Sequence, residues 1–310
     1  MHAAICIVGY RNPDDILRCL EALQGSTHSD FEVVICENGG LEAFAALTAT
    51  LPDRLSGGQP VRAMLAAGNL GYAGGVNVCL TQSPEADAWW VLNPDTAPEP
   101  QALEVQLERL GCGDCDAVGC TIYLPNGKVQ SHGGRWRTWL GRAISIAHST
   151  PLDAPVDPEA IERAQNYLNG ASMLVGRRFV ERVGPMREDY FLYCEEVEWF
   201  LRGARLGMRL GYAPGARVLH YQGTTTGSAG HVAERGRIPV YLGERNKLLL
   251  TRDCFPHKLV LVAPAVLGFL LLRYARRGAW AQFGQGLAGW WAGLRGERHA
   301  PAWFGLSSGG

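Results

Sequence analysis

Apolar runs alternate with amphipathic segments through the first 110 residues. Four short runs are apolar almost throughout, which predicts buried strands: Ala3–Gly9, Phe31–Cys36, Val61–Ala66 and Ala88–Leu92. Helical patterns predict four helices between and after them: Pro13–Gln24, Leu41–Thr50, Gly75–Gln82 and Gln101–Leu110. This alternation predicts an α/β fold with a parallel sheet covered on both faces. Such sheets bind ligands at the carboxyl ends of their strands, so we expect the chemistry at that edge.

The pattern changes after residue 125. From Asn126 to Gln165 the chain is rich in glycine, tryptophan and arginine, then in proline and aspartate, which predicts a partly mobile excursion over the active face. A second compact block follows over Asn166–Tyr221. Beyond Pro239 the pattern is helical and ends in a flexible tail, Ser307–Gly310. We therefore divide the chain into a main domain, residues 1–255, and a helical C-terminal extension, residues 256–310.

Composition narrows the class of protein. With 310 residues, 47% hydrophobic and 19% charged, the chain can bury a sizeable core. A formal net charge of −1 argues against nucleic acid as a partner, because that would favour a basic surplus. The first residues enter a strand directly and several cysteines lie in apolar runs, so we expect a reducing, cytoplasmic location. Cys112 and Cys115 have metal-ligand spacing, but no second pair follows, which favours an ordinary loop.

Polar clusters follow three of the predicted strands. They are Glu37–Gly40, Gly68–Asn77 and Asn93–Asp95. Each cluster alone is typical of a turn, whereas three in successive crossovers favour a binding site. The first strand ends in Tyr10–Asn12, without the glycine-rich loop that a dinucleotide-binding fold carries there. A nicotinamide oxidoreductase is therefore disfavoured.

Asp95 and His220 are candidate metal ligands. Asp95 is a lone carboxylate at a strand end, which suits Mg²⁺ or Mn²⁺ shared with phosphate oxygens. The alternative of equal weight is a helix cap before Pro98. His220 ends a later strand-like run, and a buried core histidine is the usual interpretation of such a residue. The Gly223–Ser228 loop that follows favours an open site instead.

Three acids begin a later amphipathic helix. Glu195, Glu196 and Glu198 precede an apolar stripe that continues to Leu206. Acids are common in a first helical turn because they complement the helix dipole, which is the alternative explanation. These acids also follow an apolar stretch, Phe191–Tyr193. A carboxyl group beside an apolar wall has a raised pKa and can act as a general base.

In combination these motifs resemble the family 2 glycosyltransferases, especially the rhamnosyltransferase-like branch, from Ala3 to Phe255. The motifs that carry the resemblance are the Tyr10–Asn12 strand end, the acid-Asn-Gly turn, Asn69–Asn77, Asn93–Asp95, Asn169–Leu174, the acid pair, His220 with Gly223, and Arg245–Asn246. The resemblance implies a GT-A fold, a Rossmann-like mixed sheet flanked by helices. It also implies inverting, Mg²⁺- or Mn²⁺-dependent transfer from a dTDP- or UDP-sugar, with dTDP-rhamnose as the leading donor, to a hydroxyl of a glycan or lipid-linked acceptor.

The resemblance also implies roles for individual residues. Glu196 matches the catalytic base, with Glu195 beside it, and Glu198 and Trp199 would hold the acceptor or orient the base. Asp95 and His220 would bind the metal, while Glu37 would contact the nucleotide base. The full set implied for the nucleotide sugar is Tyr10, Asn12, Glu37, Asn38, Asn69, Gly74, Asn77, Asn93, Asp95 and Arg245. Glu37 and Glu196 replace more frequent aspartates, Gly40 stands where serine is common, and Asn93 is neutral where many members are acidic.

The C-terminal extension carries an aromatic stripe. An apolar run, Leu259–Leu272, is short for a bilayer span and is followed by Arg273, Arg276 and Arg277. Apolar residues then recur at helical spacing: Trp280, Phe283, Leu287, Trp290, Trp291 and Leu294. Such a stripe suits a helix lying on the cytoplasmic face of a membrane. Packing on the main domain or on a second copy of the chain fits it nearly as well.

Two other functions stay open. A GT-A-like module could bind a nucleotide sugar without turning it over, although the presence of Asp95, Glu196 and His220 argues against that. A sugar nucleotidyltransferase would carry a glycine-rich loop bearing lysine or arginine after the first strand, where this chain offers only Arg11. The released product distinguishes them, because glycosyl transfer yields a nucleoside diphosphate and nucleotidyl transfer yields pyrophosphate.

Overall fold

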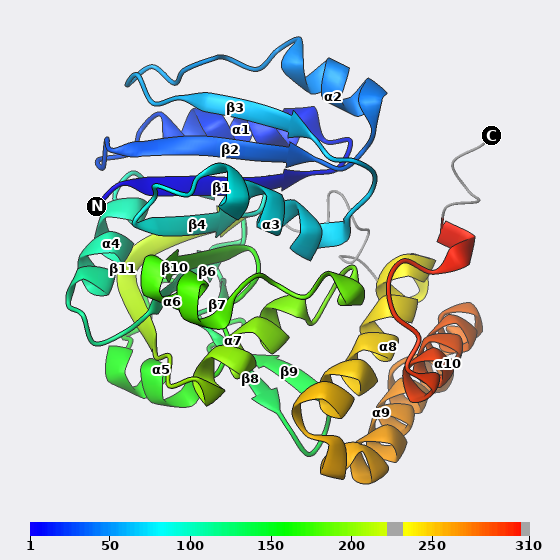
Figure 1. Cartoon of the computed structure of the whole chain (residues 1–310). Coiled ribbons are helices and arrows are strands. Elements are labelled where there is room, and N and C mark those ends of the chain that lie inside the picture. The colour runs from blue at the N-terminus through cyan, green and yellow to red at the C-terminus, as the bar shows by residue number, and fades with distance from the viewer. Residues whose placement is uncertain (222–231, 305–310) are drawn as a thin grey trace.

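The computed structural model describes residues 1–221 and 232–304, and Figure 1 shows the arrangement of their helices and strands. The predictions made for Gly223–Ser228 and for Ser307–Gly310 lie outside these residues. The strands are β1 (Ala3–Gly9), β2 (Phe31–Glu37), β3 (Val61–Leu65), β4 (Ala88–Leu92), β5 (Thr96–Pro98), β6 (Ala117–Tyr123), β7 (Val129–Ser131), β8 (Gly134–Arg137), β9 (Arg142–Ser145), β10 (Ser172–Gly176) and β11 (Leu210–His220). The helices are α1 (Pro13–Leu23), α2 (Leu41–Thr48), α3 (Gly71–Gln82), α4 (Ala102–Gly111), α5 (Pro158–Ala164), α6 (Arg177–Val183), α7 (Glu195–Arg205), α8 (Arg237–Cys254), α9 (Leu259–Arg273) and α10 (Trp280–Arg295).

In the described part of the chain, nine strands form one sheet in the order β3-β2-β1-β4-β10-β6-β11-β5, with β7 paired to β6. The first four predicted strands pair in parallel, as the sequence indicated. The sheet becomes mixed because β10 runs antiparallel between β4 and β6, and β5 runs antiparallel to β11. Because β10 is antiparallel to both β4 and β6, these two strands run in the same direction, and β11 is parallel to β6. The carboxyl ends of β1, β2, β4 and β11 therefore lie along one edge of the sheet.

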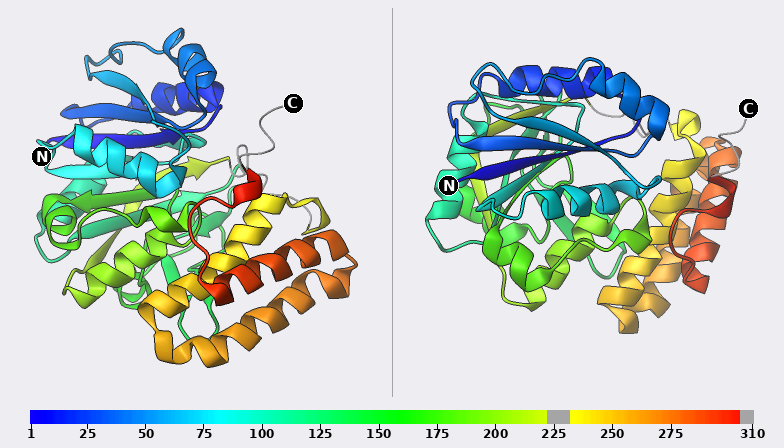
Figure 2. Two further views of the ribbon diagram at one scale, coloured as in Figure 1. Left: turned by 45° about the vertical axis from the view of Figure 1, so that its right-hand side comes forward. Right: turned by 45° about the horizontal axis from the view of Figure 1, so that its top comes forward.

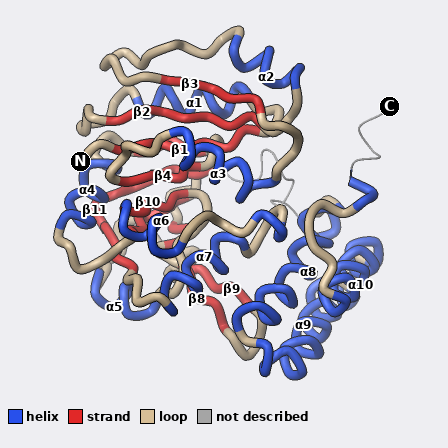
Figure 3. The backbone as a smooth tube through the Cα atoms, viewed as in Figure 1, coloured by secondary structure: helices blue, strands red, loops and turns tan. Residues whose placement is uncertain are grey.

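Helices cover both faces of the sheet (Figure 3). Alternate residues of β1 point into two different cores: Ala4 and Cys6 into one, Ile5 and Ile7 into the other. The first core takes residues of α3, α6 and α7, and the second takes residues of α1, α2 and α4. This period of two is what a strand buried on both sides requires. The mixed sheet flanked by helices confirms the predicted fold class.

Three local predictions were wrong. Helix α3 begins at Gly71 rather than Gly75, because the glycines that suggested a loop are packing sites within the helix. Asp95 does not cap a helix, since the short strand β5 follows it. Of residues 126–165 only Gln130 reaches the cavity described below, so this segment does not cover the active face. Its β8–β9 hairpin lies against the C-terminal helices, where Lys258 Nζ donates to Thr138 Oγ1 at 2.7 Å.

Helices α8, α9 and α10 form a block beside the sheet (Figure 2). The buried residues of α10 are three glycines and Ala292, and a Cβ on Gly289 would lie 2.1 Å from the Tyr241 carbonyl oxygen of α8. Gly293 approaches α8 and Gly286 approaches Leu270 of α9 in the same way. Small residues at this spacing let helices approach closely. The extension therefore docks on α8, and the glycines act as packing residues.

Docking leaves part of the aromatic stripe on the surface. Trp280 and Trp291 are 66% and 52% exposed, and four aliphatic side chains of α9 are also exposed: Val260, Leu261, Leu271 and Leu272. Within the described residues, one stretch, Pro256–Arg277, is long and apolar enough to cross a membrane by length and composition. A core helix of a soluble protein can meet the same criterion; here 28% of an 18-residue window within the stretch is buried.

Candidate active site

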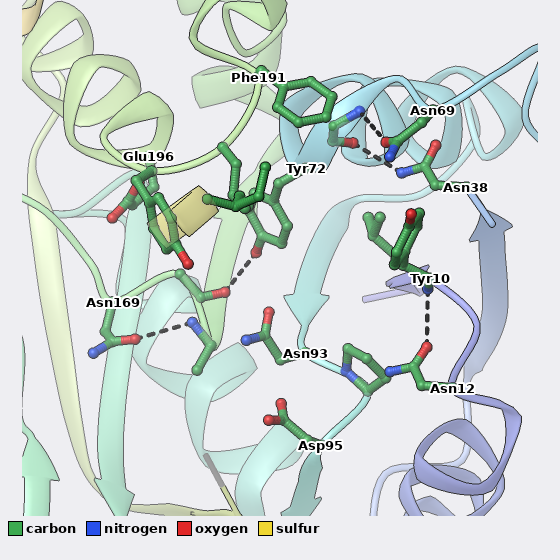
Figure 4. Close-up of a pocket in the computed structure, with 18 of the residues that line it drawn as sticks. Tyr10, Asn12, Asn38, Asn69, Tyr72, Asn93, Asp95, Asn169, Phe191 and Glu196 are labelled. Atoms are coloured by element: carbon green, nitrogen blue, oxygen red, sulfur yellow. Dashed lines mark hydrogen bonds between the residues drawn. The ribbon is translucent and has the colours of Figure 1, made fainter. Parts of the chain in front are cut away.

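A cavity of about 420 Å³ opens at the carboxyl edge of the sheet. Figure 4 shows its lining: Tyr10, Asn12 and Asn38 on one side, Asp95 at the base, and Glu196 on the opposite side. The sequence placed these side chains after different strands and before a distant helix. The structure brings eight of the predicted site residues to this one cavity: Tyr10, Asn12, Asn38, Asn69, Asn93, Asp95, Glu196 and His220.

One wall of the cavity is lined by amides. The Asn38 side chain donates to the Gly71 carbonyl at 2.9 Å and accepts from the Leu70 N–H at 3.2 Å. Asn69 Oδ1 accepts from the Gly71 N–H at 3.0 Å, and Asn12 Oδ1 accepts from the Tyr10 N–H at 2.9 Å. These bonds fix the start of α3 and the turn after β1. The wall is thus a rigid polar surface that carries no charge.

Asp95 and His220 face one another at the base of the cavity. The His220 Nε2 atom lies 3.2 Å from Asp95 Oδ1, and both residues are less than a tenth exposed. The register of β5 on β11 creates this contact, because Thr96 pairs with His220. On the other side of the ring, His220 Nδ1 lies 2.7 Å from Gln130 Oε1. When Nδ1–H donates to Gln130, the Nε2 atom of a neutral ring has its lone pair facing the Asp95 carboxylate. A ring protonated on both nitrogens forms a salt bridge with that carboxylate instead.

This donor set suits a divalent cation. A carboxylate oxygen and an imidazole nitrogen, with the second ring nitrogen held by a hydrogen bond, are common metal ligands. In the described residues no three His, Cys, Asp or Glu side chains gather into a metal-binding group. The protein would therefore supply two ligands, Asp95 and His220, and leave the remaining positions to water and to a bound phosphate. Mg²⁺ and Mn²⁺ accept such a sparse protein contribution.

An acid pair stands at the start of α7. Glu196 lines the cavity, whereas Glu195 is 2% exposed and its Oε2 atom has no hydrogen-bond partner. Burial raises the pKa of Glu195, and the charge of Glu196 raises it further. Burial also raises the pKa of Glu196, while backbone N–H groups at the helix start partly offset this. A buried carboxyl group beside a half-buried one favours a state in which only one of the two is ionised.

The loop before the acid pair is strained and tightly held. Phe191 has φ 68° and ψ −55°, the strained form of γ-turn, and the Leu192 N–H donates to the Tyr190 carbonyl across it at 2.9 Å. Tyr193 and Cys194 also have positive φ values, 74° and 72°. Backbone strain of this kind persists only where the surroundings enforce it, and it concentrates at functional sites.

Two elements enforce that loop. The Tyr72 N–H donates to the Phe191 carbonyl at 2.9 Å, and a Cβ on Gly71 would lie 2.0 Å from the same oxygen. On α8, Asn246 Nδ2 lies within 3.0 Å of the Tyr190 carbonyl and 2.8 Å of those of Leu192 and Tyr193. The apolar side chains of Phe191–Tyr193 consequently face the cavity, as the sequence suggested.

Seven predicted residues lie outside the cavity lining. Glu37 is fully buried, and its Oε1 accepts from the N–H groups of Arg11 and Gly39 at 3.0 and 2.7 Å. Glu198 binds Arg202 at 2.9 Å, while Trp199 lies in the core. The other four are Glu195, which is buried beside Glu196; Gly74, which packs on Leu70; Asn77, which holds Met186 and Glu188; and Arg245, which donates to the carbonyls of Tyr190 and His299.

Other lining residues were not assigned to the site from the sequence. Tyr72 donates through its hydroxyl to the Gly170 carbonyl at 2.5 Å, and its motif was noticed without a role. Gln130, Ile238 and Phe304 also line the cavity, and no local pattern distinguishes them from surface residues. Phe304 comes from the far end of the extension, so only the tertiary structure reveals it.

Comparisons with known proteins identify the family. Residues 4–181 match the family model described as Glycosyl transferase family 2. N-acetylglucosaminyl-diphospho-decaprenol L-rhamnosyltransferase from Mycobacterium tuberculosis is 27% identical over 267 residues, which cover 78% of this chain and 84% of that protein. This confirms the rhamnosyltransferase-like resemblance.

Two solved structures share the fold at low identity. S. aureus TarS 1-349 in complex with UDP-GlcNAc aligns with a TM-score of 0.53 and 11% identity, over 96% of this chain and 93% of that fragment. The mannosyltransferase PcManGT from Pyrobaculum calidifontis, in complex with GDP-Man and Mn²⁺, aligns with a TM-score of 0.54 and 13% identity, over 94% and 87%. The family match covers more than half of the chain, and the fold agrees with it. The chain belongs to glycosyl transferase family 2 and has the GT-A fold.

Proposed function

We propose that this glycosyltransferase is an inverting, divalent-metal-dependent enzyme that moves a sugar from a dTDP- or UDP-sugar to an acceptor hydroxyl. The observation that carries the proposal is the placement of Asp95 and Glu196 on different sides of one cavity (Figure 4), with His220 3.2 Å from Asp95. Leaving-group departure places negative charge on the diphosphate, and inversion needs a base on the other side of the sugar. The cavity offers groups of both kinds.

Asp95 and His220 would hold Mg²⁺ or Mn²⁺, which neutralises diphosphate charge when bound. Asn93, at the same strand end, would contact the ribose or a metal-bound water. The amide wall of Tyr10, Asn12, Asn38 and Asn69 would bind the nucleotide, with Glu37, Gly74, Asn77 and Arg245 supporting that wall or the loops around it. Relatives of this fold were solved with UDP-GlcNAc, or with GDP-Man and Mn²⁺, which supports this class of donor and ion.

Glu196 would accept the proton of the acceptor hydroxyl as the oxygen attacks the anomeric carbon. Its raised pKa suits a general base near neutral pH. Glu195 would keep that base in place from beneath, and Glu198 and Trp199 would brace the helix that carries it. The mycobacterial relative is named for an L-rhamnosyl donor and a decaprenol-linked acceptor, which supports dTDP-rhamnose and a lipid-linked glycan as the first substrates to test.

A lipid-linked acceptor places the enzyme at the cytoplasmic face of a membrane. The exposed apolar residues of α9 and α10 would contact the lipid, with Arg273, Arg276 and Arg277 close to anionic headgroups. A Trp280→Ser, Trp291→Ser double variant should lose binding to anionic liposomes. Equal partition of the variant and the unaltered chain would remove the membrane from the proposal and leave a second subunit as the partner of this surface.

Nucleoside diphosphate release from a panel of sugar nucleotides, with Mn²⁺ or Mg²⁺ and with EDTA, tests the function. Metal-dependent release from one donor supports transfer and identifies the sugar. Pyrophosphate release would instead indicate a nucleotidyltransferase. Donor binding without any release, even with glycan and lipid-linked acceptors present, would indicate a binding module.

A further inference from the structure

The chain returns to the cavity after α10. We call residues 296–304 the C-terminal strap. Its first anchor is Arg298, which binds Asp189 at 2.9 Å and Asp253 at 2.6 Å. The next is His299, whose N–H donates to the Asp189 carbonyl at 2.7 Å and whose carbonyl accepts from Arg245 at 2.7 Å. These bonds hold the strap against the strained loop that precedes the acid pair.

The end of the strap carries two aromatic side chains. Trp303 packs edge-on against Tyr241 at 5.4 Å, and the Arg237 guanidinium lies 3.7 Å from the centre of its ring. Phe304 packs against Phe191 at 5.5 Å and lines the cavity. The strap aromatics, the loop residues and α8 share one apolar cluster, so Phe304 is held in place from several sides.

The cavity thus has two unlike halves. Amide side chains line the half beside β1, β2 and α3, where the nucleotide is expected. Apolar side chains line the half around Phe191: Leu192, Tyr193, Ile238 and Phe304, with Glu196 also in the lining. A base must lie next to the hydroxyl that it deprotonates, so the acceptor belongs on the Glu196 side.

We infer that Phe304, held by the C-terminal strap, is a specificity-determining residue of the acceptor subsite. It favours acceptors with a hydrocarbon group next to the reacting sugar. A mixture of aliphatic and aromatic side chains suits a hydrocarbon chain, whereas a sugar ring alone would call for polar groups around its hydroxyls. This inference rests on the proposed function, and it makes part of the extension a component of the active site.

The test uses octyl β-glucoside and methyl β-glucoside as probes, below the critical micelle concentration, with UDP-loaded protein and calorimetric detection. The proteins are the unaltered chain, Phe304→Ser, Phe304→Leu and Arg298→Ala. Trp139→Ser is the matched control, because Trp139 is an exposed aromatic outside the cavity. Each methylene buried on the wall adds about fourfold in affinity, so two or three give a preference of about 10-fold or more for the octyl compound.

We expect Phe304→Ser to reduce that preference to within about twofold, whereas Phe304→Leu and Trp139→Ser keep most of it. Arg298→Ala should act like Phe304→Ser, since it releases the strap. Donor hydrolysis without acceptor should stay unchanged in the control, Trp139→Ser, because Trp139 lies outside the cavity. Equal binding of the two glucosides by the unaltered chain, or an undiminished preference in Phe304→Ser, overturns the inference. Absence of donor hydrolysis in the unaltered chain counts against the proposed function instead, so the two failures are distinguishable.

Discussion

Replacing Asn246 by alanine should disable the loop that presents the acid pair. Asn246 is fully buried on α8, and its side-chain nitrogen lies within hydrogen-bond distance of three loop carbonyls, those of Tyr190, Leu192 and Tyr193. An amide nitrogen carries only two hydrogens, so one of them is shared. The Tyr190 carbonyl also accepts from Arg245 and from the Leu192 N–H, so the loss of Asn246 falls mainly on the carbonyls of Leu192 and Tyr193.

The magnitude follows from the bonds and the strain. Removing a donor and leaving its buried acceptor unsatisfied costs about 1–3 kcal/mol per group, so the carbonyls of Leu192 and Tyr193 together give a loss of about 2–6 kcal/mol. The positive φ values of Phe191, Tyr193 and Cys194 cost about 1–3 kcal/mol each. The free energy lost with these hydrogen bonds is similar to the strain of the three positive φ values. Without the amide we therefore expect the loop to relax, and the apolar wall and the start of α7 to move with it.

We expect Asn246→Ala to lower kcat about 10- to 100-fold, because misplacing a catalytic group by an ångström has effects of this size. Donor affinity should change by less than about threefold, since the amide wall belongs to other elements. Asn246→Asp keeps the shape but turns the donor into an acceptor facing carbonyl oxygens, and it should be at least as severe. The assays are steady-state transfer, donor binding by calorimetry and thermal unfolding. Normal kcat with an unchanged thermal midpoint in both variants would refute the reasoning.

Four further predictions concern the acid pair, the metal site and the loop contact. Because burial raises the pKa of Glu196, kcat/KM should rise with pH along a limb above the ordinary carboxyl range of about 4–4.5, and a limb at or below pH 4.5 would contradict this. Because the pKa of Glu195 is raised in the folded state, the protein loses stability as pH rises through that pKa. Glu195→Gln should therefore raise the thermal midpoint more at pH 8 than at pH 5, and an equal gain at both would exclude a buried proton on Glu195. Asp95→Asn should shift the Mn²⁺ titration of activity to concentrations at least about 10-fold higher, whereas an unchanged titration would mean that Asp95 binds no metal. Gly71→Ala should destabilise the fold by about 2 kcal/mol or more, because the new Cβ would meet the Phe191 carbonyl and residue 71 has a φ of +71°. A stable, active variant would show that the loop moves freely.

The sequence was most informative where function depends on strand ends. Polar residues that follow apolar strands reach a common edge in any parallel sheet, so Tyr10, Asn38, Asn93 and Asp95 could be grouped before the structure was known. Their neighbour Glu37 could not be placed in the same way. Its carboxylate turns inward to accept backbone N–H groups, and nothing in the Glu-Asn-Gly turn distinguishes that from an open position.

Long-range contacts account for the parts that the sequence did not predict. The antiparallel β10 between β4 and β6 depends on strand pairings more than 50 residues apart. The return of Phe304 to the cavity depends on ion pairs of Arg298 with two distant aspartates. The glycines of α10 lower helix propensity, but they are explained by close contact with α8. Local sequence patterns do not predict such long-range contacts.

Glu196→Gln is the direct test of the general base, in a transfer assay with the donor that the panel identifies. We expect a loss of about 10²–10⁴-fold in kcat with donor affinity retained, because the amide keeps the shape of the side chain and loses its basicity. Glu181→Gln, which changes an exposed acid on α6, is the matched control and should transfer normally. Near-normal turnover by Glu196→Gln would show that Glu196 is not the general base and that another residue takes the proton.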